Sequence, residues 1–481
     1  MAVHYDVLIV GAGLSGIGAA YYIQEKCNRS NYAILEARDQ MGGTWDFFKY
    51  PGLRSDSDMY TFGFPFHPWK DPKAIADGNS ILEYIKDTAK TFHIDEKIKY
   101  GYRVQNVEWS SQSKKWDVCI KVNETEESIK MTCSFLLMCC GYYSYEKAYT
   151  PDFNGLDNFK GTVIHPQFWD AQLDYTNKEV VIIGSGATAI TLVPELAKKA
   201  KKVTMLQRSP TYIMNLPSED GVANFLKKIL PKKWANHLIR WKNILLSILM
   251  YSWSRKAPNS LSNLLKKGVK KSLGEKYNEK DFSPKYKPWD QRLCLVPDND
   301  FFEAMKQEKA FVETDTISGF DHNGIKTASG KHLLADIIVT ATGLHVQVLG
   351  GASIVIDGKE VDTSKLLAYR GVMFSGVPNF GVAIGYTNAS WTLKCDLNCR
   401  FISKLLNYME KNGYDVVTPD FDHDKFTTER LLDFDAGYIL RAKDVLPKQG
   451  SQAPGKVHQN YIKDLFALNY VTMNDGHLKY D

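Results

Sequence analysis

Two glycine-rich segments have the residue types and the spacing that hold a pyrophosphate. The first reads Gly11-Ala-Gly13-Leu-Ser15-Gly16, and the second reads Ile183-Gly184-Ser185-Gly186-Ala187-Thr188-Ala189. Small residues at these places form a tight turn and let the backbone approach the phosphates, which the N-terminus of a following helix stabilises. We therefore predict two dinucleotide-binding sites in one chain.

The residues that follow these segments at nearly equal distances carry opposite charges. Glu36 lies 23 residues after Gly13, and Arg208 lies 22 residues after Gly186. A carboxylate there accepts a hydrogen bond from a ribose 2′-hydroxyl, whereas an arginine can bind a 2′-phosphate through two hydrogen bonds. We expect NADP at the second site, a dinucleotide without that phosphate at the first, and hydride transfer from nicotinamide to a flavin. The alternative for Arg208 is a solvated surface charge.

The segments around these residues have the patterns of the strands and helices that would position them. Apolar runs predict strands, and Ala-rich or amphipathic runs predict helices. The first unit reads as strand Tyr5–Val10, helix Ile17–Cys27 and strand Tyr32–Leu35; the second reads as a strand from Glu179, helix Ile190–Lys198 and strand Val203–Leu206. This alternation predicts an α/β fold with two Rossmann-like, doubly wound dinucleotide-binding domains.

Length and composition indicate a large folded protein. The chain has 481 residues, 44% hydrophobic and 24% charged, which predicts roughly three domains and excludes wholesale disorder. The eight cysteines have neither Cys-x-x-Cys nor zinc spacing, so we expect free thiols and no metal site. No signal peptide is visible, and glycines interrupt the uncharged stretches Ile337–Ile356 and Gly371–Leu393. We therefore expect strands and turns in these stretches, and a cytoplasmic protein.

The cysteines also bear on where a reduced flavin would send its electrons. A disulfide reductase needs a redox-active cysteine pair, which is commonly closely spaced. The available pairs are the adjacent Cys139 and Cys140 and the wider-spaced Cys395 and Cys399. Both pairs are better explained as small apolar packing residues, so a disulfide reductase is disfavoured.

The stretch before the second glycine segment favours oxygen as the acceptor. Phe159-Lys-Gly161-Thr-Val-Ile-His165-Pro-Gln-Phe-Trp169-Asp170 resembles FxGxxxHxxxW followed by Pro or Asp, the fingerprint of the Baeyer–Villiger monooxygenases, which are class B flavoprotein monooxygenases. The segments 288–294, 340–343, 385–394 and 446–451 resemble the branch of ethionamide-activating monooxygenases. The resemblance extends over nearly the whole chain.

This resemblance implies an enzyme in which NADPH reduces FAD, oxygen adds to the flavin, and a C4a-peroxyflavin oxidises the substrate. The implied substrates are ketones, which become esters or lactones, and sulfides or thioamides, which are oxidised at sulfur. Arg292 matches the essential arginine of the family, and Asp56 matches the acid that positions it. A fixed guanidinium beside the flavin would stabilise the anionic peroxide.

The glycine segments and the resemblance together predict the cofactor contacts. On the FAD side these are Gly11, Gly13, Ser15, Gly16, Glu36, Thr44, Trp45, Asp46, Phe47 and Val104. On the NADP side they are Arg54, Ser55, Asp56, Ile183, Gly184, Ser185, Gly186, Ala187, Thr188, Ala189, Gln207 and Arg208. His165 and Trp169 are interpreted as coupling the two domains rather than as acid–base groups.

The FAD-binding domain is expected to be discontinuous. We predict residues 1–145 and 342–481 for this domain, 151–215 and 290–341 for the NADP-binding domain, and 216–289 for a helical insertion. Within the insertion, apolar spacing predicts helices over Asn224–Ile229, Trp234–Tyr251 and Leu261–Leu273.

The insertion also holds the basic excess of the chain. From Gly221 to Gly274 there are twelve Lys or Arg and no Asp or Glu, whereas the net charge of the whole chain is +5. Three interpretations stay open: a solvated face, a field that attracts NADPH, and a weak peripheral contact with anionic lipid. No motif that reads bases accompanies the charge, so nucleic acid is not an expected partner.

Two rival functions remain. One is a flavin monooxygenase restricted to nucleophilic nitrogen or sulfur, which Arg292 argues against because stabilising the anion favours attack on ketones. The other is a non-oxygenating redox sensor or membrane-docked flavoprotein, for which the basic segment is the support.

Overall fold

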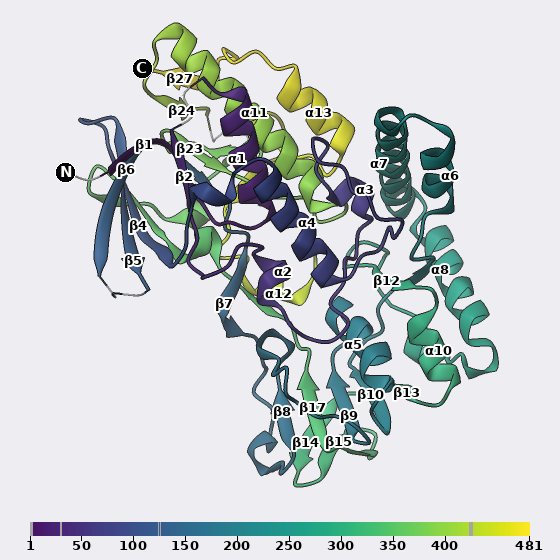
Figure 1. The fold of residues 1–481 in the computed structure, drawn as a ribbon. Coiled ribbons are helices and arrows are strands. Elements are labelled where there is room, and N and C mark those ends of the chain that lie inside the picture. The colour runs from purple at the N-terminus through teal and green to yellow at the C-terminus, as the bar shows by residue number, and fades with distance from the viewer. Residues whose placement is uncertain (1–2, 29–30, 124, 126, 423–426) are drawn as a thin grey trace.

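The computed structural model describes residues 3–28, 31–123, 125, 127–422 and 427–481. It contains two α/β domains and a group of helices that lies beside both, at the right in Figure 1. The N- and C-terminal ends both lie on the larger domain, at the upper left of the figure. The chain therefore leaves the larger domain, builds the smaller one, and returns.

The larger domain is built on a nine-stranded sheet. Its order is β20-β19-β4-β5-β6-β1-β2-β3, with β23 also paired to β6. The strands are β1 (Val3–Val10), β2 (Tyr32–Leu35), β3 (Ile98–Lys99), β4 (Tyr102–Ser110), β5 (Lys115–Val122), β6 (Ser128–Met138), β19 (Ser353–Ile356), β20 (Lys359–Glu360) and β23 (Phe380–Val382). Because β1 is parallel to both β2 and β6, their carboxyl ends meet at one edge, where such sheets bind ligands.

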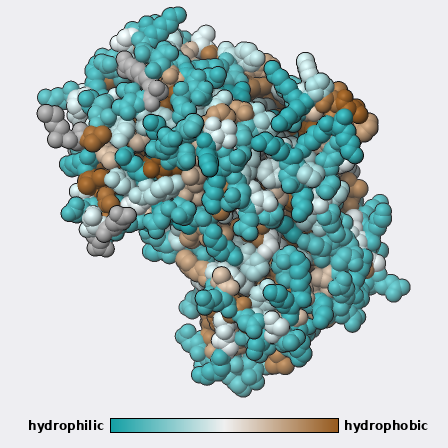
Figure 2. All heavy atoms as spheres, viewed as in Figure 1, coloured by the Kyte–Doolittle hydropathy of each residue, from teal (hydrophilic) through white to brown (hydrophobic). Residues whose placement is uncertain are grey.

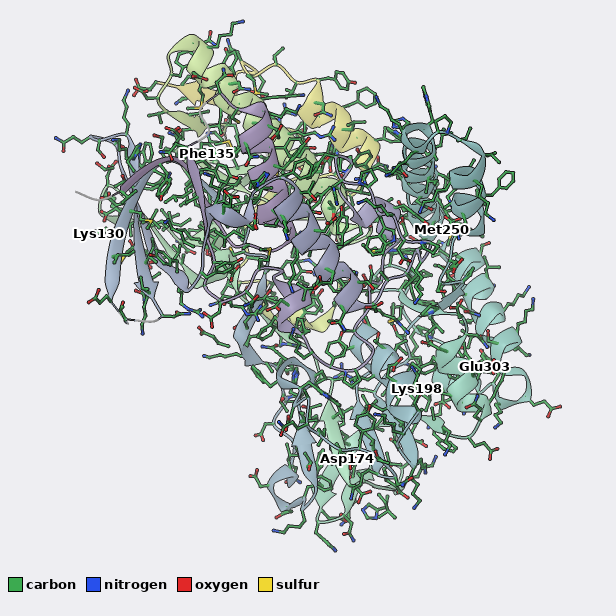
Figure 3. The ribbon with its side chains drawn as sticks, viewed as in Figure 1. Lys130, Phe135, Asp174, Lys198, Met250 and Glu303 are labelled. Carbon is green, nitrogen blue, oxygen red and sulfur yellow. The ribbon has the colours of Figure 1, made fainter. Side chains whose placement is uncertain are left out.

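Helices cover one face of this sheet and strands and loops cover the other, so β1 is buried on both faces. Val7 and Ile9 pack in one apolar cluster with helices α1 and α11, and Leu8 packs in a second cluster on the opposite face. Strand β6 is exposed at its start and buried toward its end, and Figure 3 shows Lys130 at the outer edge of the domain and Phe135 within it. The helices are α1 (Leu14–Lys26), α2 (Thr44–Phe47), α3 (Met59–Phe62), α4 (Gly78–Thr91), α11 (Trp391–Asn412), α12 (Gly437–Arg441) and α13 (Tyr461–Asn469).

Small two-stranded ribbons complete the larger domain. They pair β21 (Ala368–Tyr369) with β22 (Met373–Phe374), β24 (Val417–Pro419) with β27 (Leu478–Tyr480), and β25 (Thr428–Arg430) with β26 (Lys448–Gly450).

The smaller domain is a second doubly wound unit. Its five parallel strands have the order β13-β10-β9-β17-β8. They are β8 (Thr162–Ile164), β9 (Glu179–Ile183), β10 (Lys202–Gln207), β13 (Ala310–Thr314) and β17 (Ile337–Thr340), accompanied by helices α5 (Ala187–Ala197) and α10 (Asp300–Lys306). The antiparallel strands β14 (Ile317–Asp321), β15 (Gly324–Thr327) and β16 (His332–Leu334) form a separate small sheet.

Two ribbons mark the junctions between these parts. Strand β7 (Tyr143–Ala148) pairs with β18 (Leu344–Val346) where the chain passes between the two domains. Strand β11 (Ile213–Leu216) pairs with β12 (Cys294–Pro297) at the two ends of the helical insertion. The division into 1–145 with 342–481, 151–215 with 290–341, and 216–289 stays a prediction, and these ribbons lie near its boundaries.

The inserted helices are longer than the apolar spacing predicted. They are α6 (Gly221–Ile229), α7 (Lys232–Lys256), α8 (Pro258–Leu273) and the short α9 (Glu279–Phe282). Helix α6 begins earlier because the side chain of Asp220 accepts a hydrogen bond from the Ala223 N–H, and α8 begins with Pro258, which fits the first helical position.

The surface is mostly hydrophilic, with an apolar patch over α6 and α7 at the upper right of Figure 2. In the described part of the chain, no helix has the length and apolarity needed to cross a bilayer. The uncharged stretches Ile337–Ile356 and Gly371–Leu393 consist mainly of short strands and turns, as predicted.

Candidate active site

Both glycine segments open onto one cleft between the domains, with a volume of about 940 Å³. Most of the predicted site residues line it. These are Gly11, Gly13, Ser15, Glu36, Thr44, Trp45, Arg54, Ser55, Asp56, Val104, Ile183, Gly184, Ser185, Gly186, Ala187, Thr188, Arg208 and Arg292. The cleft thus brings together segments that are far apart in the sequence, which is what a site for two dinucleotides requires.

The helix N-termini at this cleft have the groups that a phosphate needs. Helix α1 begins after Gly13 and helix α5 after Gly186, and neither has a capping side chain. Their first N–H groups are therefore available to an anion, which the helix dipole also attracts. A side chain at Gly186 would meet no atom within 4 Å, so there is room for a ligand to approach.

The turns themselves tolerate only glycine at their first positions. Gly11 and Gly184 have φ values of +102° and +135°. A Cβ atom at Gly184 would lie 2.3 Å from the Ala341 carbonyl oxygen, which is backbone and cannot move aside. The two turns fit a pyrophosphate in the same way, and they are equivalent positions of two equivalent folds.

The ends of β2 and β10 carry the predicted opposite charges. Glu36 is 7% exposed, and its carboxylate accepts hydrogen bonds from the Ala12 N–H at 2.7 Å and the Arg38 N–H at 3.0 Å. Burial raises the pKa of Glu36 above its ordinary value, and these two hydrogen bonds oppose that rise. Arg208 is exposed in the cleft and forms no ion pair with a described residue, so its guanidinium is available to a ligand.

Arg292 and Asp56, which are 236 positions apart, form an ion pair at the wall of the cleft. Arg292 Nη1 donates to Asp56 Oδ2 at 2.7 Å, and both side chains are about one-third exposed. Asp56 has the largest influence on the pKa of Arg292 and raises it further above its ordinary value, against the effect of burial. Among the described residues, Asp56 is the one hydrogen-bond acceptor of the Arg292 side chain, so other N–H groups are available to an anion in the cleft.

Aromatic side chains that sequence reasoning missed surround this arginine. The Phe434 ring centre lies 5.9 Å from the Arg292 guanidinium carbon, and Tyr142 contacts Tyr143 through their hydroxyl groups at 3.3 Å. Tyr438 stacks parallel to Tyr142 at 6.4 Å. Burial raises the pKa of both Tyr142 and Tyr143, so their hydroxyls keep their protons and can donate hydrogen bonds.

A signal for part of this aromatic wall was present in the sequence. Tyr142 and Tyr143 follow the end of β6 by only a few residues, and the carboxyl ends of parallel strands form the ligand sites of such sheets. Phe434 lies in an irregular segment and Tyr438 lies in the short helix α12, and no pattern in the sequence places them here.

Arg54 sits beside Asp56 on the same loop and pairs with Asp300 at the start of α10. One nitrogen of its guanidinium, Nη2, is buried and has no hydrogen-bond partner among the described residues. A buried donor without a partner is costly unless a ligand satisfies it. Arg54 lines the cleft, so this observation supports the predicted contact with NADP.

Five predicted contacts lie outside the lining of the cleft. Gly16 and Ala189 are inside their helices, where a Cβ on Gly16 would lie 1.9 Å from the Gly11 carbonyl oxygen and Ala189 is fully buried. Asp46 pairs with Arg38 at 2.6 Å, and Phe47 stacks on Tyr145. These four residues pack behind the residues that line the cleft.

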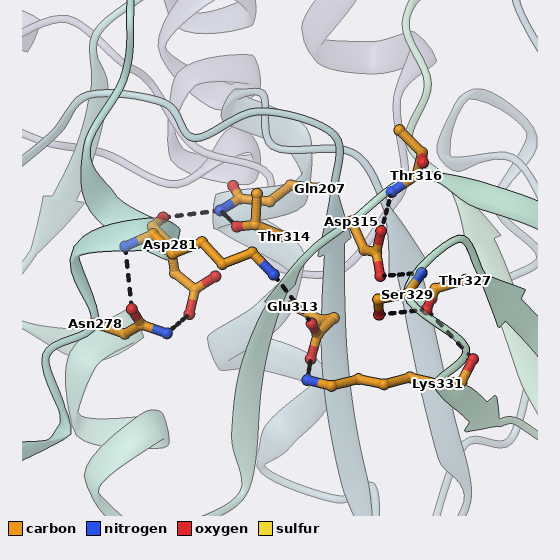
Figure 4. Close-up of polar contacts among 11 residues, drawn as sticks. Gln207, Asn278, Asp281, Glu313, Thr314, Asp315, Thr316, Thr327, Ser329 and Lys331 are labelled. Carbon is orange, nitrogen blue, oxygen red and sulfur yellow. Dashed lines mark hydrogen bonds and ion pairs between the residues drawn. The ribbon is translucent and has the colours of Figure 1, made fainter.

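Gln207, the fifth, faces the interior of the smaller domain. Its side chain is 1% exposed and donates hydrogen bonds to the Asp281 carbonyl oxygen and to Thr314 Oγ1, both at 2.8 Å (Figure 4). The prediction treated Gln207 and Arg208 alike, but neighbouring residues on a strand point to opposite faces. Only Arg208 faces the cleft.

His165 joins the two connections between the domains. Its Nε2–H donates to the Gly343 carbonyl oxygen at 3.1 Å, while Nδ1 accepts from the Gln167 N–H at 3.1 Å. Both ring nitrogens are therefore used, which fits a coupling role. Trp169 packs against an apolar cluster of the smaller domain that Tyr50 of the larger domain also contacts, and its coupling role stays a prediction.

A pH effect on stability follows from His165. Burial lowers its pKa below 6.5, so the folded protein binds fewer protons than the unfolded chain at acidic pH. The stabilising contribution is complete above pH 6.5 and decreases as the pH falls below it. We expect the Tm of the wild type to fall more between pH 7.5 and 5.5 than that of His165→Asn. His93→Asn, at an exposed histidine, should keep the wild-type profile, and equal slopes for His165→Asn and wild type would contradict the effect.

The loop that carries Arg292 is held by the helical insertion. Arg255, at the end of α7, donates to Asp290 Oδ1 at 2.9 Å and also to the Pro288 carbonyl oxygen. The ring of Tyr251, one turn earlier, packs edge-on against Trp289. We therefore expect Arg255 to position Arg292 through this loop.

For the oxygenation that the sequence resemblance implies, replacing Arg255 with alanine should lower the yield of oxygenated product per NADPH consumed. Small displacements of a reacting group can cost about 100-fold in rate, and we expect a decrease of about tenfold in kcat with KM for NADPH nearly unchanged. Arg255→Lys should restore part of the yield, because an ammonium group can still donate to the loop. If the affinity for NADPH fell as much as kcat, the result would indicate general damage to the fold instead.

Comparisons with known proteins agree with this geometry. The family model described as "Flavin-binding monooxygenase-like" matches residues 5–267. The chain is 48% identical to "FAD-containing monooxygenase EthA" of Mycobacterium tuberculosis, over 100% of this chain and 98% of that protein. It is 47% identical to "Probable FAD-binding monooxygenase AlmA" of Acinetobacter baylyi, over 100% of this chain and 97% of that protein.

Solved structures of related fold span the whole chain. A steroid monooxygenase bound to NADP matches with a TM-score of 0.78 at 20% identity, covering 99% of both chains. The enzyme OTEMO in complex with FAD and NADP matches with a TM-score of 0.76 at 19% identity, also covering 99% of both chains. At these identities the likeness establishes the two-domain fold.

Proposed function

Because the chain belongs to the flavin-binding monooxygenase-like family, we propose that it uses NADPH and molecular oxygen to insert one oxygen atom into ketones and to oxidise sulfur in sulfides or thioamides. It is an FAD-containing monooxygenase, as its family and its relatives indicate. The ketone products would be esters or lactones. The assignment of ketones and sulfur compounds as substrates is the part of this proposal that rests on the residues of the site.

The observation that carries this proposal is the ion pair of Arg292 with Asp56 in the cleft. Bound FAD would supply the redox chemistry with oxygen, and the chain supplies the charge that controls it. The Arg292 guanidinium, fixed by Asp56, would stabilise negative charge on an oxygen atom before it attacks an electrophilic carbonyl. The protonated hydroxyls of Tyr142 and Tyr143 would hold a substrate oxygen nearby.

The residues of the cleft support one cofactor at each fold. The bare N-terminus of α1 and the carboxylate of Glu36 suit the pyrophosphate and ribose of FAD. The bare N-terminus of α5, the guanidinium of Arg208 and the unpartnered Nη2 of Arg54 suit NADP. These assignments of residues to cofactors are part of the proposal.

A substrate panel tests the proposal. The purified FAD-loaded enzyme is given NADPH, oxygen and either a cyclic ketone, a linear ketone or a sulfide, and products are identified by mass spectrometry with ¹⁸O₂. We expect esters or lactones that contain one ¹⁸O atom, as well as sulfoxides. Formation of sulfoxides without esters would instead favour the rival function, a flavin monooxygenase restricted to nucleophilic nitrogen or sulfur. NADPH oxidation that no substrate alters would support a redox sensor.

We propose partners and a location on the same basis. The partners would be oxygen and a small ketone or sulfur compound, without nucleic acid. The location would be cytoplasmic, with a peripheral contact to a membrane through residues 221–274.

A further inference from the structure

Helix α6 exposes an apolar face to solvent. Val222, Phe225 and Ile229 are 56%, 59% and 57% exposed, and their spacing of three and four residues places them on one side of the helix. The same helix contacts α7 through its other side. These three large side chains therefore form a face that no described residue covers.

Helix α7 continues this apolar surface along its length. Trp234, Leu238, Leu245 and Leu249 are between 44% and 65% exposed, and steps of 4, 11 and 15 residues return to nearly the same side of a helix. The opposite side packs into the protein through Ala235, Ile239 and Ile244. Figure 2 shows apolar side chains gathered over this pair of helices. Contiguous apolar patches on a monomer are rare and mark a binding surface.

Lysines border the apolar surface where α6 meets α7. Lys228, Lys232 and Lys233 are exposed and form no ion pair with a described residue. By contrast, Arg240 and Lys242 of α7 are used by the fold: Arg240 donates to the carbonyl oxygens of Tyr60 and Gly63, and Lys242 pairs with Asp220. Within the described part of the chain, these three outward lysines therefore have no ion-pair partner.

The position of two of these lysines is also unfavourable for the helix. Lys232 and Lys233 occupy the first turn of α7, which contains no acidic residue. Positive charge at a helix N-terminus opposes the helix dipole and costs stability. An external partner of negative charge would offset this cost.

We propose that the outer surface of α6 and α7 docks on an anionic lipid bilayer. Trp234, Phe225 and their apolar neighbours would enter the boundary between headgroups and acyl chains, and the lysines would bind lipid phosphates. The long helix α7 would lie along the surface without crossing it. This inference rests on the peripheral contact proposed above and names its residues and its lipid.

The surface also leads to the active site. Helix α7 ends at Arg255, which holds the loop of Arg292. A docked enzyme would therefore stand with its insertion against the bilayer, from which ketones or sulfides of low water solubility partition.

Vesicle flotation tests this docking with the full-length, FAD-loaded enzyme. The vesicles are phosphatidylcholine alone or with 30% phosphatidylglycerol, at low and high salt. We expect binding to the anionic vesicles that weakens at high salt. The variants Phe225→Ser with Trp234→Ser, and Lys228→Glu with Lys232→Glu and Lys233→Glu, should each lower the partition coefficient at least tenfold.

A matched control replaces exposed lysines elsewhere. Lys115→Glu, Lys130→Glu and Lys359→Glu change the charge equally on the larger domain, where Figure 3 places Lys130 far from Met250 of α7, and should leave binding unchanged. NADPH oxidation in solution verifies that each variant is folded.

Two outcomes overturn the docking proposal. If the control variant and the α6–α7 variants bind the anionic vesicles equally, the binding reflects non-specific attraction of charge rather than this surface. Absence of vesicle binding, with a dimer in sedimentation that Phe225→Ser and Trp234→Ser convert to monomer, would identify a second copy as the occupant. Neither outcome depends on oxygenation, so failure here is distinct from failure of the proposed function.

Discussion

Replacing Arg292 with alanine is expected to abolish product formation while NADPH is still consumed. Arg292 offers N–H groups to the cleft, and Asp56 fixes its position and charge. Removing a fixed donor to a developing oxyanion typically costs about 100- to 1000-fold in rate, and we expect a loss of at least that size in ester yield. NADPH consumption should continue, with hydrogen peroxide in place of ester.

The measurement compares ester, peroxide and NADPH in the same reaction. Arg292→Lys should recover little, because an ammonium group lacks the planar arrangement of donors. Asp56→Asn keeps a hydrogen-bond acceptor but loses the charge, and should give an intermediate yield. Arg430→Ala, at an exposed arginine that pairs with Asp435, serves as the control. Wild-type yields from Arg292→Ala would remove the basis for the proposed ketone chemistry.

Replacing Arg208 with alanine should change the choice of coenzyme. Hydrogen bonds to charged groups contribute about 1.5 to 3 kcal/mol, and each 1.4 kcal/mol corresponds to about tenfold. We therefore expect kcat/KM for NADPH to fall about ten- to a hundredfold, with kcat/KM for NADH almost unchanged because NADH has no 2′-phosphate.

Steady-state oxidation of the two coenzymes measures this change directly. Lys202→Ala is a matched control on the same strand, where Lys202 lies over the Phe311 ring, and it should alter neither coenzyme. An equal loss for NADPH and NADH would mean that Arg208 supports the fold or the pyrophosphate rather than the 2′-phosphate.

The parts of the site that could be predicted from the sequence are those set by local geometry. The Gly11 and Gly184 turns follow short apolar strands, so strand, turn and helix lie within about 20 residues. Glu36 and Arg208 directly follow the next strands, β2 and β10, and the parallel order of each sheet carries them to the cleft. Each inference needed only the periodicity of strands and helices.

The parts that depend on long-range packing could not be predicted in this way. The pairing of Arg292 with Asp56 came from a family resemblance, because no spacing relates two residues 236 positions apart. Gln207 shows the limit within a single strand, since the face that meets the cleft depends on what packs behind it. The wall that includes Tyr438 depends on the helix α12, whose five residues are too few to carry a periodic signal.

The loop from Arg54 to Asp56 bears one consequence for assembly. It presents a cation and an anion two residues apart, and each meets the opposite charge on the other side of the cleft, at Asp300 and Arg292. A shift of the loop by two residues in one direction would bring Arg54 opposite Arg292, and a shift in the other direction would bring Asp56 opposite Asp300. Either shift replaces an attraction with a repulsion, so the alternating signs favour a single alignment of the two domains.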